Sequence, residues 1–259
     1  MEFNLNYLAV LINSTIRSTT PVLLAALGSA ICSQVGVFNI ALEGQMLIGS
    51  FTAIVINYLT GSTLLSVLGG VLSGALVGLI VAILQVKYNG ADMVIGTSIN
   101  LLVGGITSIL LTVILGVRGS FSSPDLVSLK NIKLPIINNI PLMNKLFQNL
   151  TIIDYISYII AFLIFIYLYR TVIGFRTRSV GINKDASESL GINATRIRMA
   201  TVVLSGALCG LGGVVLSLGQ VTLFTENMTA GRGFIAMAAA SMGQQHPLLT
   251  VLSSLFFGA

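Results

Sequence analysis

The chain has 259 residues, of which 55% are hydrophobic and only 8% are charged, and its mean hydropathy is +0.97. A soluble domain of this size carries about 25% charged residues, so the composition excludes a water-soluble globule and predicts a membrane protein. The net charge is +5, but the 13 basic residues are spread among loops and do not alternate with aromatic residues. This distribution excludes a nucleic-acid-binding surface.

Apolar windows of about 18 or more residues recur along the chain, which predicts several transmembrane helices rather than one signal peptide. Six windows are long enough to span a bilayer: residues 20–37, 38–59, 62–86, 91–117, 152–169 and 199–218. We therefore expect an all-α, polytopic transmembrane bundle of roughly seven to nine spans or half-spans. Residues 1–259 are expected to form a single transmembrane domain.

Both ends of the chain leave questions about the number of spans. Residues 7–18 are apolar but are interrupted by Asn13, Ser14 and Arg17. They fit either an interfacial helix or the start of a longer, tilted span. Near the other end, residues 248–259 are apolar but stop as though a span were cut midway. The sequence is therefore expected to be C-terminally truncated, with further spans beyond residue 259.

Two loops carry most of the charge and predict the orientation of the chain. Residues 117–151 hold three of the five prolines, which is typical of an irregular, water-exposed loop. Residues 170–198 hold six basic residues, two acidic residues and no proline. Because basic residues gather in cytoplasmic loops, residues 170–198 are expected inside and, by counting spans, residues 117–151 outside.

Glycines recur at four-residue spacing inside two of the windows. The two rows are Gly70, Gly74 and Gly78, and Gly206 and Gly210. Rows of small residues let helix backbones approach closely in lipid, so these glycines are predicted to pack helices together. Residues 72–78 also match residues 204–210 at six of seven positions. The match fits either an internal duplication, which is common in transporters, or chance and shared packing needs.

Polar side chains interrupt the second and fourth windows. A carboxylate inside the membrane costs about 2.5–3.5 kcal/mol, so Glu43 is expected to face the bundle interior, a cavity or a partner such as Asn39 one turn earlier. Asn100 could join two helices or bind a polar cargo. Asn39, Glu43 and Asn100 are therefore the candidates for lining a translocation pathway. Three polar residues after the last window fit either a solvated loop or a docking site: Glu226, Asn227 and Arg232.

Residues 181–193, within the basic loop, predict a short amphipathic helix. Ala186 and Leu190 are four residues apart, and Gly191 suits a helix C-cap. Taken alone, the segment fits either a docking element for a partner or a helix resting on the membrane surface.

The chain lacks the residue patterns of an enzyme. Cys32 and Cys209 lie in apolar stretches, and the lone histidine, His246, has no cysteine or carboxylate nearby in sequence. These residues indicate neither a metal site nor a catalytic constellation. The sequence contains no phosphate-binding Gly-x-x-x-x-Gly-Lys-Ser motif, so no cofactor is expected, and any ATP would be bound by another subunit.

Three ordered motifs resemble permease subunits of bacterial ABC importers in the branched-chain amino acid and ribose permease superfamily. The nucleoside and simple-sugar permeases are most similar. Their early motif, Asn-Ile-Gly-Leu-Glu-Gly, differs from residues 39–44 only at Ala41, and their Gly-Arg-Gly-Phe-Ile-Ala motif matches residues 231–236 completely. The third motif lies in residues 181–193. The resemblance extends from about Pro21 to the last residue.

This resemblance implies a function and a set of partners. The basic loop would contain the coupling helix that contacts an ATPase subunit, through residues drawn from Gly181, Asn183, Lys184, Glu188 and Gly191. A second permease subunit, identical or different, would complete the pathway, and a lipid-anchored substrate-binding protein would lie outside the bacterial cytoplasmic membrane. The alternative is a secondary transporter or channel driven by an ion gradient, in which Glu43 would bind protons or sodium.

Overall fold

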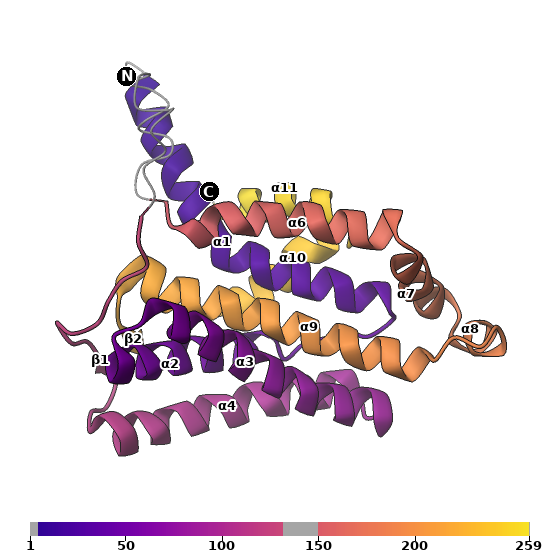
Figure 1. Ribbon diagram of the computed structural model, residues 1–259, viewed down its shortest axis with the longest axis horizontal. Helices are drawn as coiled ribbons and strands as arrows, with labels where there is room; N and C mark the ends of the chain where they lie inside the picture. The colour runs from indigo at the N-terminus through magenta and orange to yellow at the C-terminus, as the bar shows by residue number, and fades with distance from the viewer. Residues whose placement is uncertain (1–4, 132–149, 259) are drawn as a thin grey trace.

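The computed structural model describes residues 5–131 and 150–258 and is almost entirely helical (Figure 1). Its α-helices are α1 (Leu5–Gln34), α2 (Leu42–Thr60), α3 (Thr63–Ala82), α4 (Asp92–Leu115), α6 (Ile152–Arg170), α7 (Val172–Ile182), α8 (Lys184–Ser189), α9 (Ala194–Val214), α10 (Arg232–Met242) and α11 (Pro247–Gly258). The π-helical segments η1 (Ile83–Lys87) and η2 (Val215–Val221) continue α3 and α9. Strands β1 (Ser120–Phe121) and β2 (Phe224–Thr225) form one antiparallel pair.

Five of these helical segments are long and apolar enough to cross a membrane. They are Ala9–Gln34, Thr63–Lys87, Asp92–Leu115, Ile152–Arg170 and Ala194–Val221. With α2 and the shorter helices α10 and α11, the described residues contain eight candidate spans or half-spans, within the expected range. The prediction of an all-α, polytopic membrane protein is confirmed.

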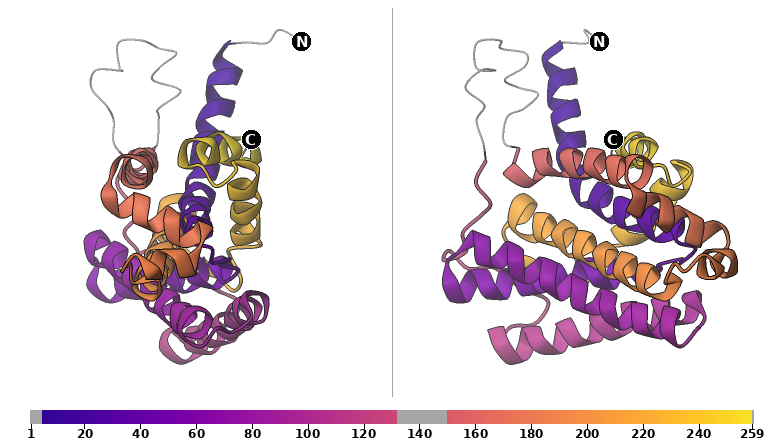
Figure 2. Two further views of the ribbon diagram at one scale, coloured as in Figure 1. Left: turned by 90° about the vertical axis from the view of Figure 1, so that its right-hand side faces the viewer. Right: turned by 45° about the vertical axis from the view of Figure 1, so that its right-hand side comes forward.

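Helix α1 shows that residues 7–18 begin a longer helix and do not form a separate one. Pro21 lies inside α1 and has no N–H for the carbonyl of Arg17, four residues earlier. That carbonyl instead accepts a hydrogen bond from Gln220 Nε2 at 2.7 Å. Figures 1 and 2 show α1 changing direction along its length, as expected for a helix with an internal proline.

Helix α9 is the centre of the bundle, and α1, α2 and α3 all pack against it. The two predicted glycine rows face each other here: a Cβ on Gly74 would lie 2.7 Å from the Cα of Gly210, and one on Gly206 would lie 2.9 Å from the Cα of Gly78. Residues 72–78 and 204–210 are thus opposite each other. Both segments therefore share the requirement for close backbone approach, which is one of the two explanations for their sequence match.

The connecting segments separate into two ends of the bundle, as the span count predicts (Figure 1). One end holds Gly61, the β1 and β2 pair and the start of α6. There the side chain of Asn57 binds the backbone of Val127 through both its amide atoms, at 2.8 and 3.1 Å. The other end holds Lys87 and helices α7 and α8. Within the proline-bearing loop, residues 132–149, including Pro135 and Pro141, lie outside the described residues.

The first two predicted windows were wrong at their junction. Helix α1 ends at Gln34 and α2 begins only at Leu42, so residues 35–41 are not helical. Hydropathy continues unbroken through this stretch and conceals the break. The side chain of Asn39 accepts a hydrogen bond from the backbone N–H of Ala41 at 3.0 Å, a local bond that competes with the helical pattern.

Candidate functional site

The candidate site lies where α2 and α10 begin inside the bundle instead of at its ends. The position of Asn100 shows how far inside the bundle α2 begins, because its Nδ2 donates a hydrogen bond to the carbonyl of Ile40 at 2.9 Å, just before α2. Asn100 is eight residues into α4, or about 12 Å from the end of that helix at 1.5 Å per residue. The start of α2 is therefore well within the thickness of the bundle.

Glu43 connects the two interior helix starts. Its Oε1 accepts a hydrogen bond from the N–H of Gly231 at 2.8 Å, and its Oε2 accepts one from Gly233 at 2.7 Å. These N–H groups belong to the N-terminus of α10, where no intrahelical acceptor is available and the helix dipole favours a negative charge. The half-buried carboxylate of Glu43 thus caps a helix that starts inside the membrane-spanning bundle.

Two glycines make this contact possible. Gly231 has φ +83°, a conformation that side chains with a Cβ adopt rarely. A Cβ on Gly233 would lie 2.7 Å from the Cα of Glu43, so any larger residue would push α10 away. Together these positions allow the α10 backbone to approach the carboxylate directly.

Asn100 holds the start of α2 against α4. Besides the bond to Ile40, its Oδ1 accepts a hydrogen bond from the N–H of Gly44 at 2.7 Å. Its amide thus binds one carbonyl just before α2 and one N–H in the first turn of α2, so Asn100 joins α4 to the start of α2. Its side chain is half-buried, so it also lies at the edge of the site.

Asn39 does not contact Glu43 as the sequence suggested, because it precedes α2 and does not lie one helical turn before the carboxylate. The side chain is 1% exposed. Its Nδ2 donates to Gln45 Oε1 and to Ser205 Oγ, both at 3.1 Å. Asn39 therefore lies buried inside the bundle, where it links the non-helical residues 35–41 to α9.

Sequence reasoning did not assign the α10 residues to this site. Gly231 and Gly233 enter the sequence argument only through the family resemblance, although glycine is the residue that permits positive φ and close backbone approach. Asn227, for which the sequence fits either a solvated loop or a docking site, is exposed, and its Oδ1 lies 3.5 Å from where a Cβ on Gly104 would be. It therefore projects beside the middle of α4. The guanidinium of Arg232 donates to two carbonyls of its own loop, at 3.2 and 3.3 Å.

The predicted cytoplasmic helix is shorter than expected and has well-defined caps. Asn183 caps the start of α8 by accepting the N–H of Ala186 at 3.0 Å. At the other end Gly191, with φ +79°, donates to the carbonyl of Glu188 at 2.9 Å, and Ile192 donates to Ser187 at 3.1 Å. This pair of bonds is a Schellman motif, which requires a left-handed residue at the Gly191 position.

Gly181 belongs to a different helix than predicted. It lies in the last turn of α7, where a Cβ would overlap the carbonyl oxygen of Gln34, the last residue of α1. Arg198, near the start of α9, donates through Nε to the carbonyl of Val35 at 2.9 Å. The basic loop is therefore packed directly against the non-helical segment before α2, residues 35–41. Lys184 is half-buried and Glu188 is exposed.

Within residues 5–131 and 150–258, no three His, Cys, Asp or Glu side chains gather as a metal site would require. Cys32 and Cys209 are buried and free of disulfides. His246 packs against the rings of Tyr169 and Phe165, with ring centroids 4.9 and 5.5 Å away. Its surroundings are those of a packed aromatic residue.

Comparison with known families gives a match over residues 11–259 to "Branched-chain amino acid transport system / permease component". The chain belongs to this permease family. The guanosine ABC transporter permease protein NupQ of Bacillus subtilis is 33% identical over 97% of the chain and 80% of its own length. The nucleoside ABC transporter permease protein NupC of Lactococcus lactis is 33% identical over 98% of the chain and 81% of its own length.

A more distant relative extends the range of named cargoes. The putative glucose ABC transporter permease protein TsgC13 of Haloferax volcanii is 26% identical over 98% of the chain and 76% of its own length. No solved structure matches the chain. As a member of a permease family, the chain is a multi-pass membrane component of a transport system and not an enzyme.

Proposed function

We propose that the chain is the membrane-spanning permease subunit of an ATP-driven importer for nucleosides or simple sugars in a bacterial cytoplasmic membrane. The observation that carries this proposal is the capping of α10 by Glu43 inside the bundle. Broken helices whose ends meet near the middle of the membrane are where transporters commonly bind or gate their cargo. The nucleoside and glucose permeases among the relatives support the cargo class.

The chemistry of the site suits a neutral, hydroxyl-rich cargo. Asn227 is exposed and Asn100 and Glu43 are half-buried, so amide and carboxylate groups border the region around the two helix starts. Ribose hydroxyls and base edges require such donors and acceptors once they leave water. Because the carboxylate of Glu43 already accepts two backbone hydrogen bonds, the structure favours a capping role over reversible ion binding, which the secondary-transporter alternative requires.

The remaining parts of the importer would be separate subunits. An ATPase subunit would supply the energy, a second permease, identical or different, would complete the pathway, and a lipid-anchored protein would deliver cargo from outside. The docking element for the ATPase would be α8 and its flanks. Ile182 is 87% exposed and Leu190 is 81% exposed, although both lie among charged residues at the tip of the bundle. Exposed apolar side chains in that setting indicate a partner surface.

A contiguous set of contacts links this tip to the site. Gly181 touches the end of α1 at Gln34, and Arg198 binds the carbonyl of the next residue, Val35. Residues 35–41 then lead to Glu43, which binds α10. Movement of α7 and α8 by a partner would therefore act first on residues 35–41, whose non-helical backbone can change conformation more easily than a helix.

The cargo assignment is tested by uptake in cells that lack this protein and in cells to which it is restored. We expect restored uptake of a radiolabelled nucleoside that excess nucleoside suppresses and that branched-chain amino acids leave unchanged. Pentoses in a third arm separate the sugar cargo from the nucleoside. Unchanged nucleoside uptake in the deletion strain would contradict the proposed cargo. Uptake that survives ATP depletion but stops when the proton gradient collapses would instead support the secondary transporter.

The coupling role predicts that Gly191→Val separates ATP hydrolysis from transport in the assembled complex. Valine at φ +79° is strained by roughly 1–2 kcal/mol, which would distort the end of α8. Gly61→Val is the matched control, because Gly61 also follows a helix with φ +63°, has no neighbour near its Cβ and lies at the opposite end. We expect continued ATP hydrolysis with uptake reduced several-fold in Gly191→Val alone. Equal uptake in the two variants would refute the assignment.

A further inference from the structure

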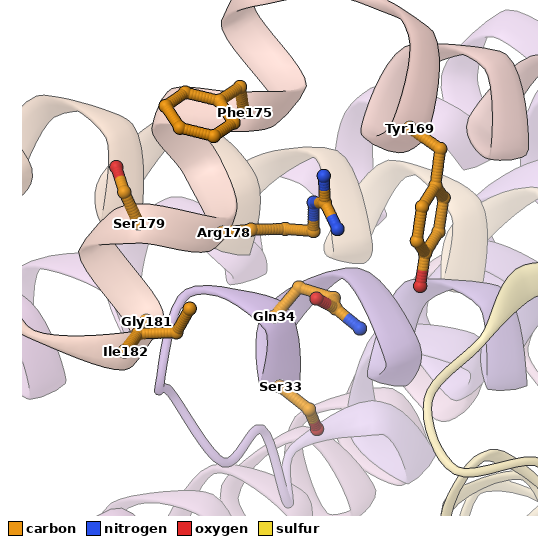
Figure 3. A pocket seen from close by; sticks show the side chains of 8 residues that line it. All are labelled: Ser33, Gln34, Tyr169, Phe175, Arg178, Ser179, Gly181 and Ile182. Carbon is orange, nitrogen blue, oxygen red and sulfur yellow. The ribbon is translucent and has the colours of Figure 1, made fainter.

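A pocket of about 400 Å³ opens between the last turn of α1, the end of α6 and helix α7 (Figure 3). Its lining residues are Ser33, Gln34, Tyr169, Phe175, Arg178, Ser179, Gly181 and Ile182. Gln34 and Arg170 are the last residues of two membrane-crossing segments, so the pocket lies at the level where the bundle leaves the membrane. This is the end that carries the basic loop.

Arg178 is the only charged side chain among the residues that line this pocket, and no carboxylate among the described residues pairs with it. Figure 3 shows its guanidinium group between α7 and the ring of Tyr169. The guanidinium carbon lies 4.5 Å from the centre of that ring, and the buried Nε has no hydrogen-bond partner. A buried Nε–H without an acceptor is costly, and an anion in the pocket would bring the acceptor and the negative charge that the described residues do not supply.

The outer side of α7 carries three large apolar side chains. Val172, Ile173 and Phe175 are all exposed, and Phe175 also lines the pocket. Arg176, on the same helix, is exposed as well. A wall of apolar side chains beside a cationic pocket fits a ligand that has both an anionic group and a hydrocarbon part. A soluble anion such as inorganic phosphate would gain nothing from that wall.

We propose that this pocket binds the phosphate group of an anionic phospholipid, with Arg178 as the phosphate-binding residue and the exposed apolar side chains of α7 beside the acyl chains. Guanidinium groups bind phosphate oxygens through paired hydrogen bonds, and basic pockets between membrane helices on the cytoplasmic side commonly hold lipid headgroups. Tyr169, held between Arg178 and His246, fixes the guanidinium position. The proposal stands independently of the cargo.

The test measures lipid binding to the full chain purified in neutral detergent, by native mass spectrometry during titration with phosphatidylglycerol or phosphatidylcholine. We expect Arg178→Gln to weaken phosphatidylglycerol binding about tenfold or more, the loss of a charge-assisted hydrogen bond, and to leave phosphatidylcholine binding unchanged. Arg176→Gln removes the same charge from an exposed position of α7 and is the control, with an expected change below about twofold. Arg178→Lys keeps the charge without the planar fork and should retain part of the binding.

Three results would overturn the proposal. Equal weakening by Arg178→Gln and Arg176→Gln would show general surface attraction only. Arg178-dependent binding of inorganic phosphate that displaces phosphatidylglycerol would identify a soluble anion as the ligand. Unchanged lipid binding in Arg178→Gln combined with lost assembly with the ATPase subunit would assign the pocket to a carboxylate of that partner. A thermal unfolding curve for each variant excludes loss of binding through misfolding.

Discussion

Replacing Glu43 with alanine is expected to reduce uptake at least tenfold and to lower the thermal stability of the bundle. The substitution removes both acceptors from the N–H groups of Gly231 and Gly233, which then have no partner at the start of α10. A hydrogen bond to a charged group contributes about 1.5–3 kcal/mol to stability, and each 1.4 kcal/mol changes an equilibrium constant about tenfold. Uptake in cells and unfolding of the purified protein measure the two effects.

The matched control for this variant is Glu226→Ala. Glu226 also accepts a backbone hydrogen bond, from Gly119 at 3.0 Å, but it is exposed at the end of the bundle. We expect the free energy of unfolding of Glu226→Ala to change by less than about 1 kcal/mol, because water replaces the lost acceptor. Glu43→Gln keeps an oxygen acceptor for one N–H group but places an NH2 donor against the other. Uptake by this variant should therefore lie between that of the wild type and that of Glu43→Ala. Wild-type stability of Glu43→Ala would show that the carboxylate does not hold α10.

Replacing Gly206 with valine is expected to prevent assembly of the bundle or to destabilise it severely. A Cβ at this position would overlap the carbonyl oxygen of Gly74 and lie 2.9 Å from the Cα of Gly78. Both neighbours are backbone atoms of α3 and cannot rotate away. Overpacking in a well-packed interior costs about 1–3 kcal/mol even for extra methylenes, and here two helix backbones would have to separate.

Gly105→Val provides the control for the glycine rows. Gly105 also lies in the middle of a membrane-crossing helix, α4, but no atom lies within 4 Å of its hypothetical Cβ. We expect this variant to reach the membrane and to give a single symmetric peak in size-exclusion chromatography, whereas Gly206→Val should aggregate or express poorly. If the two variants behave alike, the opposed glycine rows do not hold α3 and α9 together.

Much of the fold follows from local sequence. Hydropathy predicts the membrane-crossing helices within a few residues, with two exceptions. Helix α1 extends back to Leu5, and the segment around Asn39 is not helical, so α2 begins only at Leu42. The glycine spacing indicated close packing, and the two rows proved to face each other. Gly191 was correctly placed at a helix end because its residue type and position suffice for that assignment.

The candidate site was only half visible in the sequence. The unfavourable transfer of a carboxylate into lipid identified Glu43 as a residue that needs a partner. The partner could not be identified, because Gly231 is 188 positions away and contributes a backbone N–H, which every residue other than proline also has. Side-chain identity predicted which group must be satisfied, and three-dimensional proximity decided which backbone satisfies it.

The sequence by itself therefore determined that this protein is a multi-pass helical membrane protein, because hydropathy, glycine spacing and basic loops are local properties that any fold must respect. The permease class came from the resemblance of its motifs to a known family. Only the tertiary structure decided that Glu43 caps α10, that a non-helical segment of residues 35–41 separates α1 from α2, and that α7 packs on the end of α1. The physical reason is that polar groups in a membrane are satisfied by whichever neighbours the packing brings close.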